Sequence, residues 1–408
     1  MTLIECFTKS HIDNMGACLR LQPEKLIMVG PEETMTDSVK RYQKLLQRRG
    51  QAAKITMCDV QGKDFGGICH ILYDLVRKEA PCVIDLTGGD EPVIMAVGAV
   101  LAELDEDMRH QIRVEKFDPS ISTVVDCMDG NRPLSYGPVR LTIAELIELH
   151  GGCLLADSYQ PSQNCSYRDI SGLWQVVAEA PKDWNRTIPY LNEFENRGDS
   201  GMQVYLPMED LRDITDFERK ESDVRSLLDQ LHQACAVDDH SNWDALDYTY
   251  TSALMRYCTR KAGNVLETKT LLEGRAVTEN GMPFFQDCRM SVSIDWDGVI
   301  SSKDKHKPET RNEIDVVLMH GMTPLFISCK NGNIGEELYK LHTVAERFGG
   351  PYAKKMLIAT DLDQTSSSTR EALRRRAWDM DILLVTDAGS YSHKEWAECL
   401  LRAMDREV

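Results

Sequence analysis

Four polar side chains interrupt an aliphatic stretch in the last third of the chain. The segment 311–332 reads RNEIDVVLMHGMTPLFISCKNG and contains Glu313, Asp315, Ser328 and Lys330. A cluster of carboxylates is repulsive unless it takes up a proton or binds a cation, and its oxygens suit Mg²⁺ or Mn²⁺. A lysine beside such an ion can orient a water nucleophile or stabilise the charge that develops on a phosphoryl oxygen. These residue types therefore predict metal-assisted chemistry at a phosphoryl group.

A β-hairpin is the element that would bring these four side chains together. EIDVVLM and PLFISCK are two apolar-rich strands, and the residues at 321–322 suit a two-residue turn with glycine first. That turn sets Asp315 opposite Ser328 and Glu313 opposite Lys330. Strand side chains alternate between two faces, so the other face of the hairpin is wholly apolar and must be core. Because opposed Cβ atoms lie about 4.5–5.5 Å apart, the carboxylates, the hydroxyl and the ammonium group can converge.

The same residues also allow a plainer interpretation, a solvated strand end. Glu313 and Lys330 would then form a cross-strand ion pair at the surface, a common arrangement that contributes little to stability. The four residues by themselves leave both interpretations open.

A second group of candidate residues lies in the segment LTGGDEP, residues 86–92, which follows a short apolar run and opens a helical pattern. Thr87, Gly88 and Gly89 occupy that strand-to-helix turn. Helix N-termini offer unpaired N–H groups to phosphate, and paired glycines let the backbone approach a ligand closely. A tight turn in which Asp90 caps the helix is the alternative.

The loop after the first strand, with Thr8, Lys9 and Ser10, is expected at the same edge of the sheet. Ligands of parallel α/β sheets bind at the carboxyl ends of the strands. Neither loop has the GxGxxG pattern of a dinucleotide-binding fold or the pattern of a P-loop. The two loops therefore predict a ligand site of another kind.

Strand and helix patterns alternate over the first 130 residues. The expected strands are 2–7, 25–29, 52–58, 82–86 and 122–128, and the expected helices are 11–20, 34–49, 65–79 and 91–104. This alternation predicts a mostly parallel sheet with helices on both faces. Residues 151–250 are less regular, and we expect a connecting region there. From residue 251 the expected order is one helix over 251–272, three strands, then helix, strand, helix and strand.

The composition fits a globular protein of two or three domains, with 408 residues of which 42% are hydrophobic and 27% charged. No apolar run reaches the roughly 18–20 residues of a membrane span, and the N-terminus lacks a signal-peptide pattern, so we expect no membrane partner and a cytoplasmic location. Thirteen cysteines form no CxxC pair and predict free thiols. The net charge of −18 is carried almost wholly by the first 250 residues, which argues against general coating of nucleic acid.

The hairpin region resembles the PD-(D/E)xK nuclease superfamily. An aspartate before a hairpin, then x-x-Lys on the returning strand, within a helix–strands–helix–strand order, carries this resemblance. GNVLETKTL (263–271) adds a helical glutamate, Glu267, of the kind that completes such a site, and EELYKLHTVAERFGG (336–350) resembles the next helix of one subgroup. In that subgroup a CRISPR-associated Rossmann-like (CARF) domain precedes the nuclease, and residues 1–130 with LTGGD look like that domain. The whole chain is thus similar to the Can2/Card1-like CARF–nuclease effectors of type III CRISPR systems.

This resemblance implies an α/β fold with an N-terminal Rossmann-like CARF domain at 1–150, a connecting region at 151–250 and a C-terminal PD-(D/E)xK restriction-endonuclease-like domain at 251–408. It implies a homodimer in which two CARF domains form one pocket for cyclic tetra-adenylate (cA4), a second messenger of type III CRISPR antiviral defence. The implied activity is ligand-activated cleavage of DNA, and of single-stranded RNA, by an enzyme that needs Mn²⁺ or Mg²⁺.

The resemblance also assigns roles to single residues. Asp315 matches the first motif aspartate, Lys330 the motif lysine and Glu267 the helix glutamate. The carbonyl of Cys329 matches a backbone metal ligand. The residues that match the ligand-binding loops are Thr8, Lys9, Ser10, Thr87, Gly88, Gly89 and Asp90.

One position departs from the motif, because the second carboxylate falls on Ser328, whose hydroxyl is a weaker ligand for a hard cation. The missing carboxylate is expected at Glu313, Glu336 or Glu337, and the hairpin register favours Glu313. The expected metal ligands are therefore Asp315, Glu267, Glu313 and the Cys329 carbonyl. Ser328 favours an alternative function, a cyclic-nucleotide-sensing regulatory protein with a degenerate and inactive nuclease fold, whereas Asp315 and Lys330 oppose it.

Overall fold

The chain divides into two compact units, Met1–Gly152 and Cys153–Val408. The computed structural model describes residues 1–118, 123–155, 159–198, 201–298, 311–330, 334–360 and 367–405. Within these ranges no helix is both long enough and apolar enough to cross a membrane.

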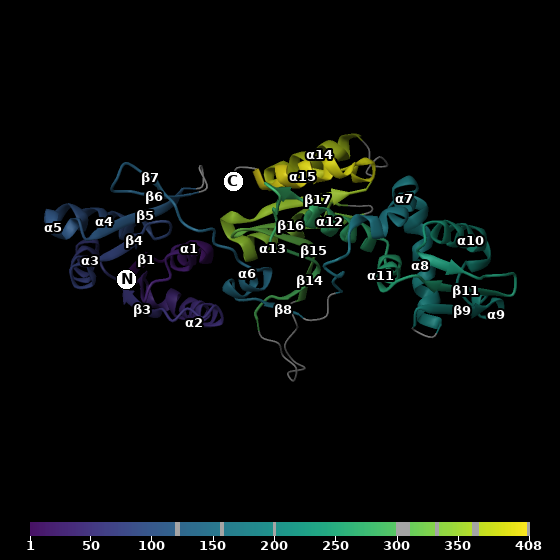
Figure 1. The fold of residues 1–408 in the computed structure, drawn as a ribbon, viewed down its shortest axis with the longest axis horizontal. Helices are drawn as coiled ribbons and strands as arrows, with labels where there is room; N and C mark the ends of the chain where they lie inside the picture. The colour runs from purple at the N-terminus through teal and green to yellow at the C-terminus, as the bar shows by residue number, and fades with distance from the viewer. Residues whose placement is uncertain are drawn as a thin grey trace. The chain divides into compact units, whose positions relative to one another are not determined.

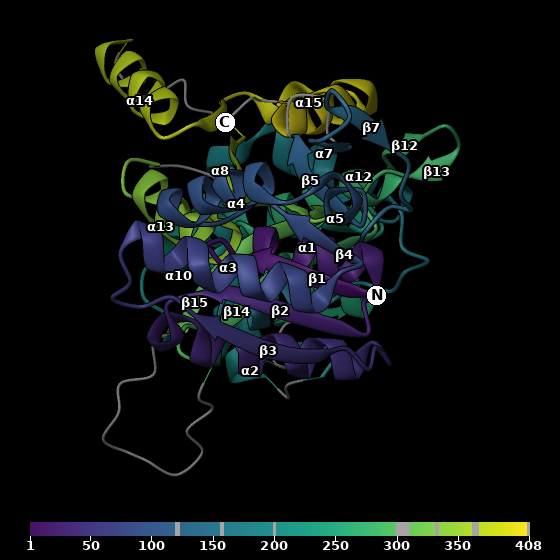
Figure 2. The same ribbon diagram turned by 90° about the vertical axis from the view of Figure 1, so that its left-hand side faces the viewer.

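The first unit is built on a seven-stranded sheet with the order β3-β2-β1-β4-β5-β6-β7. Neighbouring strands from β3 to β5 are parallel, and β6 and β7 are antiparallel additions at one edge. Figure 2 shows the parallel strands side by side, with β3 lowest. Its elements are β1 (Thr2–Cys6), α1 (His11–Leu21), β2 (Lys25–Gly30), α2 (Glu32–Arg48), β3 (Lys54–Asp59), α3 (Phe65–Glu79), β4 (Cys82–Asp85), α4 (Glu91–Glu103), α5 (Glu106–Arg109), β5 (Ile112–Asp118), β6 (Thr123–Asp126), β7 (Arg132–Leu134) and α6 (Ile143–Leu149).

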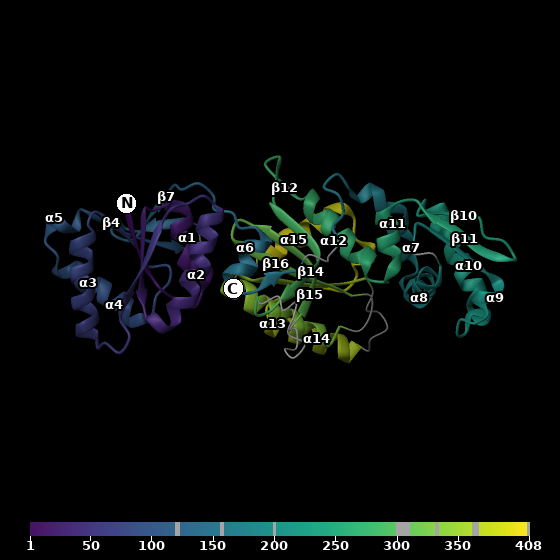
Figure 3. The same cartoon turned by 90° about the horizontal axis from the view of Figure 1, so that it is seen from below.

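Helices cover both faces of this sheet, as expected for a mostly parallel sheet. Figure 3 shows the sheet between α1 and α2 on one side and α3 and α4 on the other. The face toward α3 and α4 is apolar, with Ile4, Ile27 and Ile84 packed in one core with Leu72 and Val97.

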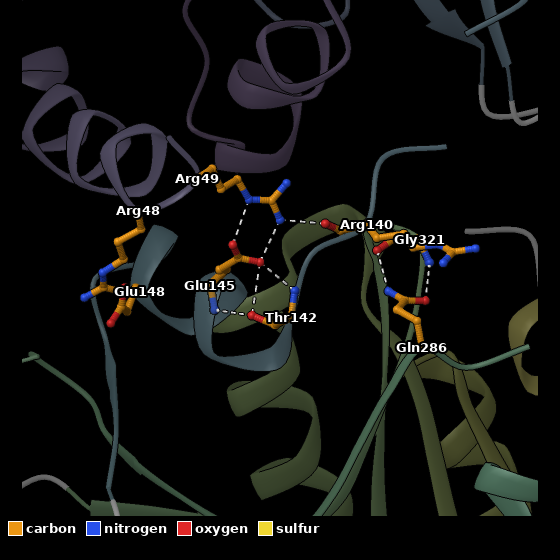
Figure 4. Close-up of polar contacts among 8 residues, drawn as sticks. All are labelled: Arg48, Arg49, Arg140, Thr142, Glu145, Glu148, Gln286 and Gly321. Carbon is orange, nitrogen blue, oxygen red and sulfur yellow. Dashed lines mark hydrogen bonds and ion pairs between the residues drawn. The ribbon is translucent and has the colours of Figure 1, made fainter. Parts of the chain in front are cut away.

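Helix α6 is attached to α2 by charged contacts, which Figure 4 shows. The guanidinium of Arg49 donates to both carboxylate oxygens of Glu145, each at 2.7 Å. Arg48 forms an ion pair with Glu148 one turn further along α6. Glu145 also completes a capping box with Thr142 at the start of the helix, so one carboxylate both begins α6 and fixes it to α2.

The second unit contains a six-stranded sheet with the order β18-β17-β16-β15-β14-β8. Strands β14, β15 and β16 are antiparallel, and β16, β17 and β18 are parallel. Helices α12 and α15 lie on one side of the sheet and α13 on the other (Figure 3). A separate three-stranded sheet has the order β10-β11-β9.

The elements of this unit follow one another along the chain as shown in Figure 1. They are β8 (Cys153–Leu154), η1 (Tyr167–Ile170), α7 (Ser171–Glu179), α8 (Pro181–Arg197), β9 (Gln203–Pro207), α9 (Met208–Leu211), α10 (Phe217–Gln233), β10 (Val237–Asp239), β11 (Ala245–Tyr250), α11 (Ala253–Arg260), α12 (Asn264–Ala276), β12 (Thr278–Glu279), β13 (Met282–Pro283), β14 (Asp287–Asp295), β15 (Arg311–His320), β16 (Thr323–Lys330), α13 (Glu337–Gly349), η2 (Gly350–Tyr352), β17 (Lys354–Ala359), α14 (Ser367–Asp379), β18 (Ile382–Val385), η3 (Ala388–Ser390) and α15 (His393–Asp405).

One continuous hydrophobic core runs through this unit. It contains Trp184, Phe194 and Tyr248 from the region 151–250 together with Val316 and Trp396 from the region beyond it. The less regular middle of the sequence is therefore folded against the six-stranded sheet.

The helix expected over 251–272 is divided into α11 and α12. The backbone groups at the division are taken up by side chains, since Asn264 Nδ2 donates to the carbonyl of Tyr257 at 2.7 Å and Trp184 Nε1 donates to that of Ala262 at 3.0 Å. The division places Glu267 in the first turn of α12.

Helix α12 also carries a buried lysine enclosed by aromatic rings. The ammonium group of Lys269 lies 3.6 Å from the ring centre of Tyr167, 5.8 Å from that of Trp174 and 5.5 Å from that of Trp396. It also forms an ion pair with Glu273 one turn along the helix. Because the rings come from η1, α7 and α15, cation–π contacts join α12 to three other helical segments.

Candidate functional site

From Val316–Ile327 to His320–Thr323 the hairpin of β15 and β16 has the register that the sequence predicts, and the polar residues lie beyond the last of these pairs. Val316 pairs with Ile327 and Leu318 with Leu325, and Gly321 at φ 61° begins the turn. The side-chain amide of Gln286 fixes this turn by accepting from the amide N–H of Gly321 at 2.9 Å and donating to its carbonyl at 2.8 Å (Figure 4). The apolar face of the hairpin is buried, which leaves the polar residues together at the open end of the two strands.

Asp315 is the centre of this polar group. Its Oδ2 atom accepts hydrogen bonds from the backbone N–H of Cys329 at 2.6 Å and from the hydroxyl of Ser328 at 3.1 Å. The ammonium nitrogen of Lys330 lies 3.4 Å from the same oxygen. Three consecutive residues of β16 thus hold the carboxylate of Asp315 in one orientation.

Lys330 is shared between two carboxylates. Besides Asp315, its ammonium group approaches Oε2 of Glu337, at the start of α13, to 3.3 Å. Burial by itself would lower the pKa of Lys330, but the charges of Asp315 and Glu337 raise it above its usual range. The lysine therefore carries a positive charge at neutral pH.

Glu267 adds a carboxyl group from α12. Its Oε2 atom accepts a hydrogen bond from the hydroxyl of Ser291, on β14, at 3.1 Å. Burial, and then the charge of Asp315, raise the pKa of Glu267 to about 7, with a further contribution from Glu313. A carboxyl group whose ionisation is opposed by neighbouring carboxylates gains from any cation that enters among them.

The three carboxylates considered as replacements for the motif position lie in different surroundings. Glu313 is exposed at the end of β15, where it pairs in register with Ser293, and its charge acts on Glu267. Glu336 is exposed at the start of α13. Burial opposes ionisation of Glu337, yet Lys340 and Lys330 together hold its pKa below the usual range, so Glu337 is already committed to two lysines.

The oxygens around Asp315 fit a hard divalent cation. Within the described residues no three His, Cys, Asp or Glu side chains are grouped closely enough to hold a metal ion by themselves. Mg²⁺ is commonly bound by one or two carboxylates, and water and substrate phosphates fill its other positions. The carboxylates of Asp315 and Glu267 and the Ser328 hydroxyl, which donates to Asp315, are oxygen groups of the kind that this mode of binding uses.

Sequence reasoning missed two residues next to Glu267. The hydroxyl groups of Ser291 and Tyr257 share a 2.6 Å hydrogen bond, and the Ser291 hydroxyl also donates a hydrogen bond to Glu267. Neither residue could be singled out from the sequence, because a serine in a strand and a tyrosine in a helix are ordinary core or surface residues.

In the first unit the two candidate loops lie next to each other. β1 and β4 are adjacent parallel strands, and the strand order reverses between them, which is where open α/β sheets bind ligands. The loops also touch, because a Cβ added to Gly88 would stand 2.6 Å from Cγ2 of Thr8. Gly89 adopts φ 109°, and a Cβ there would stand 2.6 Å from that of Cys6, so both glycines are required by the close approach of the loops.

Each loop is held by hydrogen bonds to residues of the neighbouring strands and helix. The N–H and hydroxyl of Thr87 donate to Oδ1 of Asp85 at 2.7 and 2.5 Å, and the Thr87 hydroxyl accepts from the N–H of Phe117 at 2.9 Å. Asn14 bonds both the N–H and the carbonyl of Thr8, at 2.8 and 2.7 Å. The hydroxyl of Thr87 is thus used to hold its own loop.

The other predicted residues of these loops lie around the same edge. Ser10 caps α1 by accepting from the N–H of Asp13 at 3.4 Å. Asp90 stands at the start of α4 with no side-chain capping bond, and Lys9 is exposed. The backbone N–H groups at the start of α4 and the exposed Lys9 are the features of this edge that suit an anionic ligand.

Beneath these loops lies a row of buried carboxyl groups that the sequence did not predict. Glu5 on β1, Asp85 on β4 and Glu115 on β5 are register neighbours, and each is fully buried. Arg20 approaches Asp85 to 4.0 Å and Arg113 approaches Glu115 to 3.3 Å. Within the described part neither side-chain oxygen of Glu5 has a hydrogen-bond partner. Burial, followed by the charge of Asp85, raises the pKa of Glu5 well above its usual range.

Comparison with known proteins shows similarity in structure. No family model matches the chain, and no curated protein does. The protein VC1899 from Vibrio cholerae has a solved structure that matches with a TM-score of 0.71 and 16% identity, over 99% of this chain and 97% of that one. Can2 from Sulfobacillus thermosulfidooxidans, solved in complex with cyclic tetra-adenylate, matches with a TM-score of 0.66 and 16% identity, over 99% and 97% of the two chains.

At this level of identity the likeness establishes the fold. The expected α/β fold class is confirmed, and the two compact units fit a two-domain arrangement like that of Can2. The resemblance to Can2/Card1-like effectors that the motifs carried is confirmed at the level of the fold, and the chain has the fold of Can2 over its whole length.

Proposed function

We propose that this chain is a metal-dependent endonuclease activated by a cyclic oligoadenylate, with cA4 as the activator, that cleaves DNA and single-stranded RNA in type III CRISPR antiviral defence. The observation that carries this proposal is the convergence of Asp315 and Lys330 on one hairpin with Glu267 from α12 beside them. We assign ligand binding to residues 1–150 and cleavage to 251–408, and we place the protein in the cytoplasm.

The residues of the site have separate tasks in this proposal. Asp315, held by three donors of β16, is the fixed carboxylate. Lys330 keeps its charge at neutral pH and can donate to a non-bridging phosphate oxygen or to the attacking water, which stabilises the charge of the transition state. Glu267, whose pKa the charge of Asp315 raises, adds a second carboxyl group from α12.

Mn²⁺ or Mg²⁺ would be held by Asp315, Glu267, Glu313 and the carbonyl of Cys329, with Ser328 beside them. The bound ion would polarise the phosphodiester and favour ionisation of the attacking water. The raised pKa of Glu267 supports this assignment, because an added positive charge would let both carboxyl groups ionise together.

The ligand assignment rests on the edge formed by the β1 and β4 loops. Can2, which has the same fold, was solved with cA4, and the strand order of this sheet also reverses between β1 and β4. The loop residues assigned to the ligand are Thr8, Lys9, Ser10, Thr87, Gly88, Gly89 and Asp90. A cyclic tetranucleotide has repeated phosphates, so we propose that two copies of the chain form its pocket as a homodimer.

Cleavage assays test the proposal directly. A supercoiled plasmid and a labelled single-stranded RNA would be incubated with the protein, Mn²⁺ and cA4, and with each component left out in turn. We expect cleavage only when all are present, and cyclic tri- and hexa-adenylate would replace cA4 to define the ring size. Cleavage that does not depend on any cyclic oligoadenylate would contradict the activation part.

A second function is supported by the surroundings of Ser328 and Lys330. A serine stands at a motif carboxylate position, and Lys330 is bound by Glu337 as well as Asp315. Both features fit a regulatory protein that senses the cyclic nucleotide through an inactive nuclease fold. Ligand binding without cleavage under every combination of metal and ligand would establish that function in place of the first.

A further inference from the structure

Ser291 stands out on β14 because of its backbone conformation. Its φ is 46°, in the left-handed region that residues with a Cβ atom avoid outside turns. Ser291 nevertheless lies inside a nine-residue strand and is 8% exposed. A strained non-glycine residue that persists in a buried strand is a reason to look for a task of its side chain.

The strand around Ser291 is held from both sides. Along β15 the pairs Met290–Val316 and Val292–Ile314 frame it, which sets Ser291 opposite Asp315. On the other side the amide of Gln160 accepts from the N–H of Met290 at 3.2 Å and donates to its carbonyl at 2.5 Å. These contacts fix the backbone next to Ser291.

The hydroxyl of Ser291 joins two other side chains. It donates to Oε2 of Glu267 at 3.1 Å and lies 2.6 Å from the hydroxyl of Tyr257. A serine hydroxyl has one proton, so when Glu267 accepts it, Tyr257 must donate to Ser291. The ring of Tyr257 is held in turn by Tyr159, stacked on it with centres 4.4 Å apart.

We propose that Ser291 is a positioning residue, which turns the carboxylate of Glu267 toward Asp315 and is itself oriented by Tyr257. The inference rests on the proposed function for the task of Glu267, and it extends the site to α11, β14 and the segment that contains Tyr159 and Gln160. Residues just after the first unit thereby support the geometry of the metal site, since hydrogen-bond partners of metal ligands fix their orientation.

Two substitutions of the same residue separate the hydroxyl from the strained backbone. Ser291→Ala removes the hydroxyl and keeps a Cβ at φ 46°, whereas Ser291→Gly removes both. We expect both variants to lose about 10–100-fold in Mn²⁺ affinity, the usual effect of removing such a partner. Ser291→Gly is expected to be the more stable of the two, because glycine accepts this conformation freely.

The measurements are isothermal titration of Mn²⁺ into the whole protein and urea unfolding of each variant. Tyr257→Phe keeps the ring stacking and removes the donor, and we expect a smaller loss of affinity than in the serine variants. Asn280→Gly is the control, because Asn280 has φ 50° in an exposed turn and its change should leave Mn²⁺ affinity unaltered.

A purely structural serine would give a different pattern, with Mn²⁺ affinity following stability, so that Ser291→Gly would bind better than Ser291→Ala. That result, or full affinity in both variants, would overturn the inference. If the unaltered protein binds no Mn²⁺, the proposed function fails. Crystal structures of the unaltered protein and of Ser291→Gly then test the role of Ser291 independently of metal binding. In Ser291→Gly the Glu267 carboxylate should leave its position beside Asp315. An unchanged position of this carboxylate would overturn the inference that Ser291 positions it.

Discussion

Oε2 of Glu337 lies 3.3 Å from the ammonium nitrogen of Lys330, so a residue of α13 shares with Asp315 the lysine at the end of β16. The motif lysine is therefore joined to the helix that follows the hairpin. The positive charge of Lys330 is paired with the carboxylates of Asp315 and Glu337. Substitutions of these and neighbouring residues are therefore expected to differ in their effects on the site.

Removal of the lysine should abolish cleavage. Lys330→Ala deletes the charged group of the hairpin that can donate to a developing phosphoryl charge, and loss of one such donor commonly costs on the order of 10²–10³-fold in rate. Rates of plasmid cleavage with Mn²⁺ and cA4 provide the measurement. The affinity for cA4, measured by titration, should stay unchanged, and loss of both properties would point to misfolding instead. Lys340→Ala serves as the control, because Lys340 pairs with Glu337 from an exposed position.

Glu313, rather than Glu336 or Glu337, should contribute to metal binding. Glu313→Gln removes a charge that acts on Glu267, so we expect weaker Mn²⁺ binding. Glu337→Gln affects a carboxylate already paired with Lys330 and Lys340. Glu313, not Glu336, is among the charges that raise the pKa of Glu267, so both the Glu336 and Glu337 variants should keep their Mn²⁺ affinity. The assignment would be wrong if Glu337→Gln alone lost it in a calorimetric titration.

Restoring a carboxylate at the departing motif position should make the protein depend on metal for stability. Ser328→Asp replaces a hydroxyl that lies 3.1 Å from Oδ2 of Asp315 by a second negative charge, which is destabilising until a cation binds. We expect a lower unfolding free energy in EDTA and a larger gain on adding Mn²⁺ than in the unaltered protein. Equal gains in thermal unfolding scans of the two proteins would show that position 328 lies outside the metal site.

A single methyl group at Gly88 should be enough to disturb ligand binding. The Cβ of Gly88→Ala would stand 2.6 Å from Cγ2 of Thr8 and 3.0 Å from the carbonyl oxygen of Cys6, so the two loops must separate. Such overpacking commonly costs about 1–3 kcal/mol, equivalent to roughly a 5–150-fold loss of cA4 affinity if the strain falls on the pocket. Mn²⁺ binding should persist. Gly88→Trp should block activation completely, and cA4-dependent cleavage by that variant would refute the pocket assignment.

The buried row beneath the loops should make the first unit less stable as the pH rises. The folded-state pKa of Glu5 is raised by burial and then by the charges of Asp85, Asp13 and Glu115, while Arg20 opposes them. The folded state therefore holds a proton that the unfolded chain has lost, and stability falls through the range between the two pKa values, by about 1.4 kcal/mol for each pH unit. Burial also raises the pKa of Asp85, to about 6, so the effect of Glu5 is clearest above pH 6.

Glu5→Gln imitates the protonated carboxyl group and should remove this pH dependence. Hydrogen exchange of β1 and β4, measured between pH 6 and 8 and corrected for intrinsic rates, gives their local unfolding free energies. We expect a falling free energy for the unaltered protein and a nearly constant one for Glu5→Gln. Parallel lines for the two proteins would mean that Glu5 is ionised within the fold.

The parts of the fold that follow hydrophobic pattern were predictable from the sequence. The hairpin register was set by one glycine turn and by strict alternation, and the structure reproduces it. Strand β5 escaped prediction because IRVEKFD reads as a charged segment, although Glu115 is fully buried in it. No local pattern shows that a carboxyl group will be covered by neighbours from other strands.

Other features depend on contacts between distant segments and could not be read locally. The division between α11 and α12 is stabilised by Trp184 and Asn264, of which the first is far away in the sequence. The conformation of Ser291 is equally hidden, because serine is not a residue type that signals positive φ. The sequence therefore showed which residue types could form the site. The orientation of each side chain depends on contacts with residues that are distant in the sequence.

The aromatic enclosure of Lys269 restricts how the acidic side chain two residues before it can move. A rotation of α12 about its own axis would withdraw the ammonium group from Tyr167, Trp174 and Trp396 at once, although its ion pair with Glu273 on the same helix would persist. These contacts therefore oppose rotation of α12 about its own axis. If the proposed activation moves Glu267, α12 is expected to move as a rigid piece, together with the segments that supply those rings.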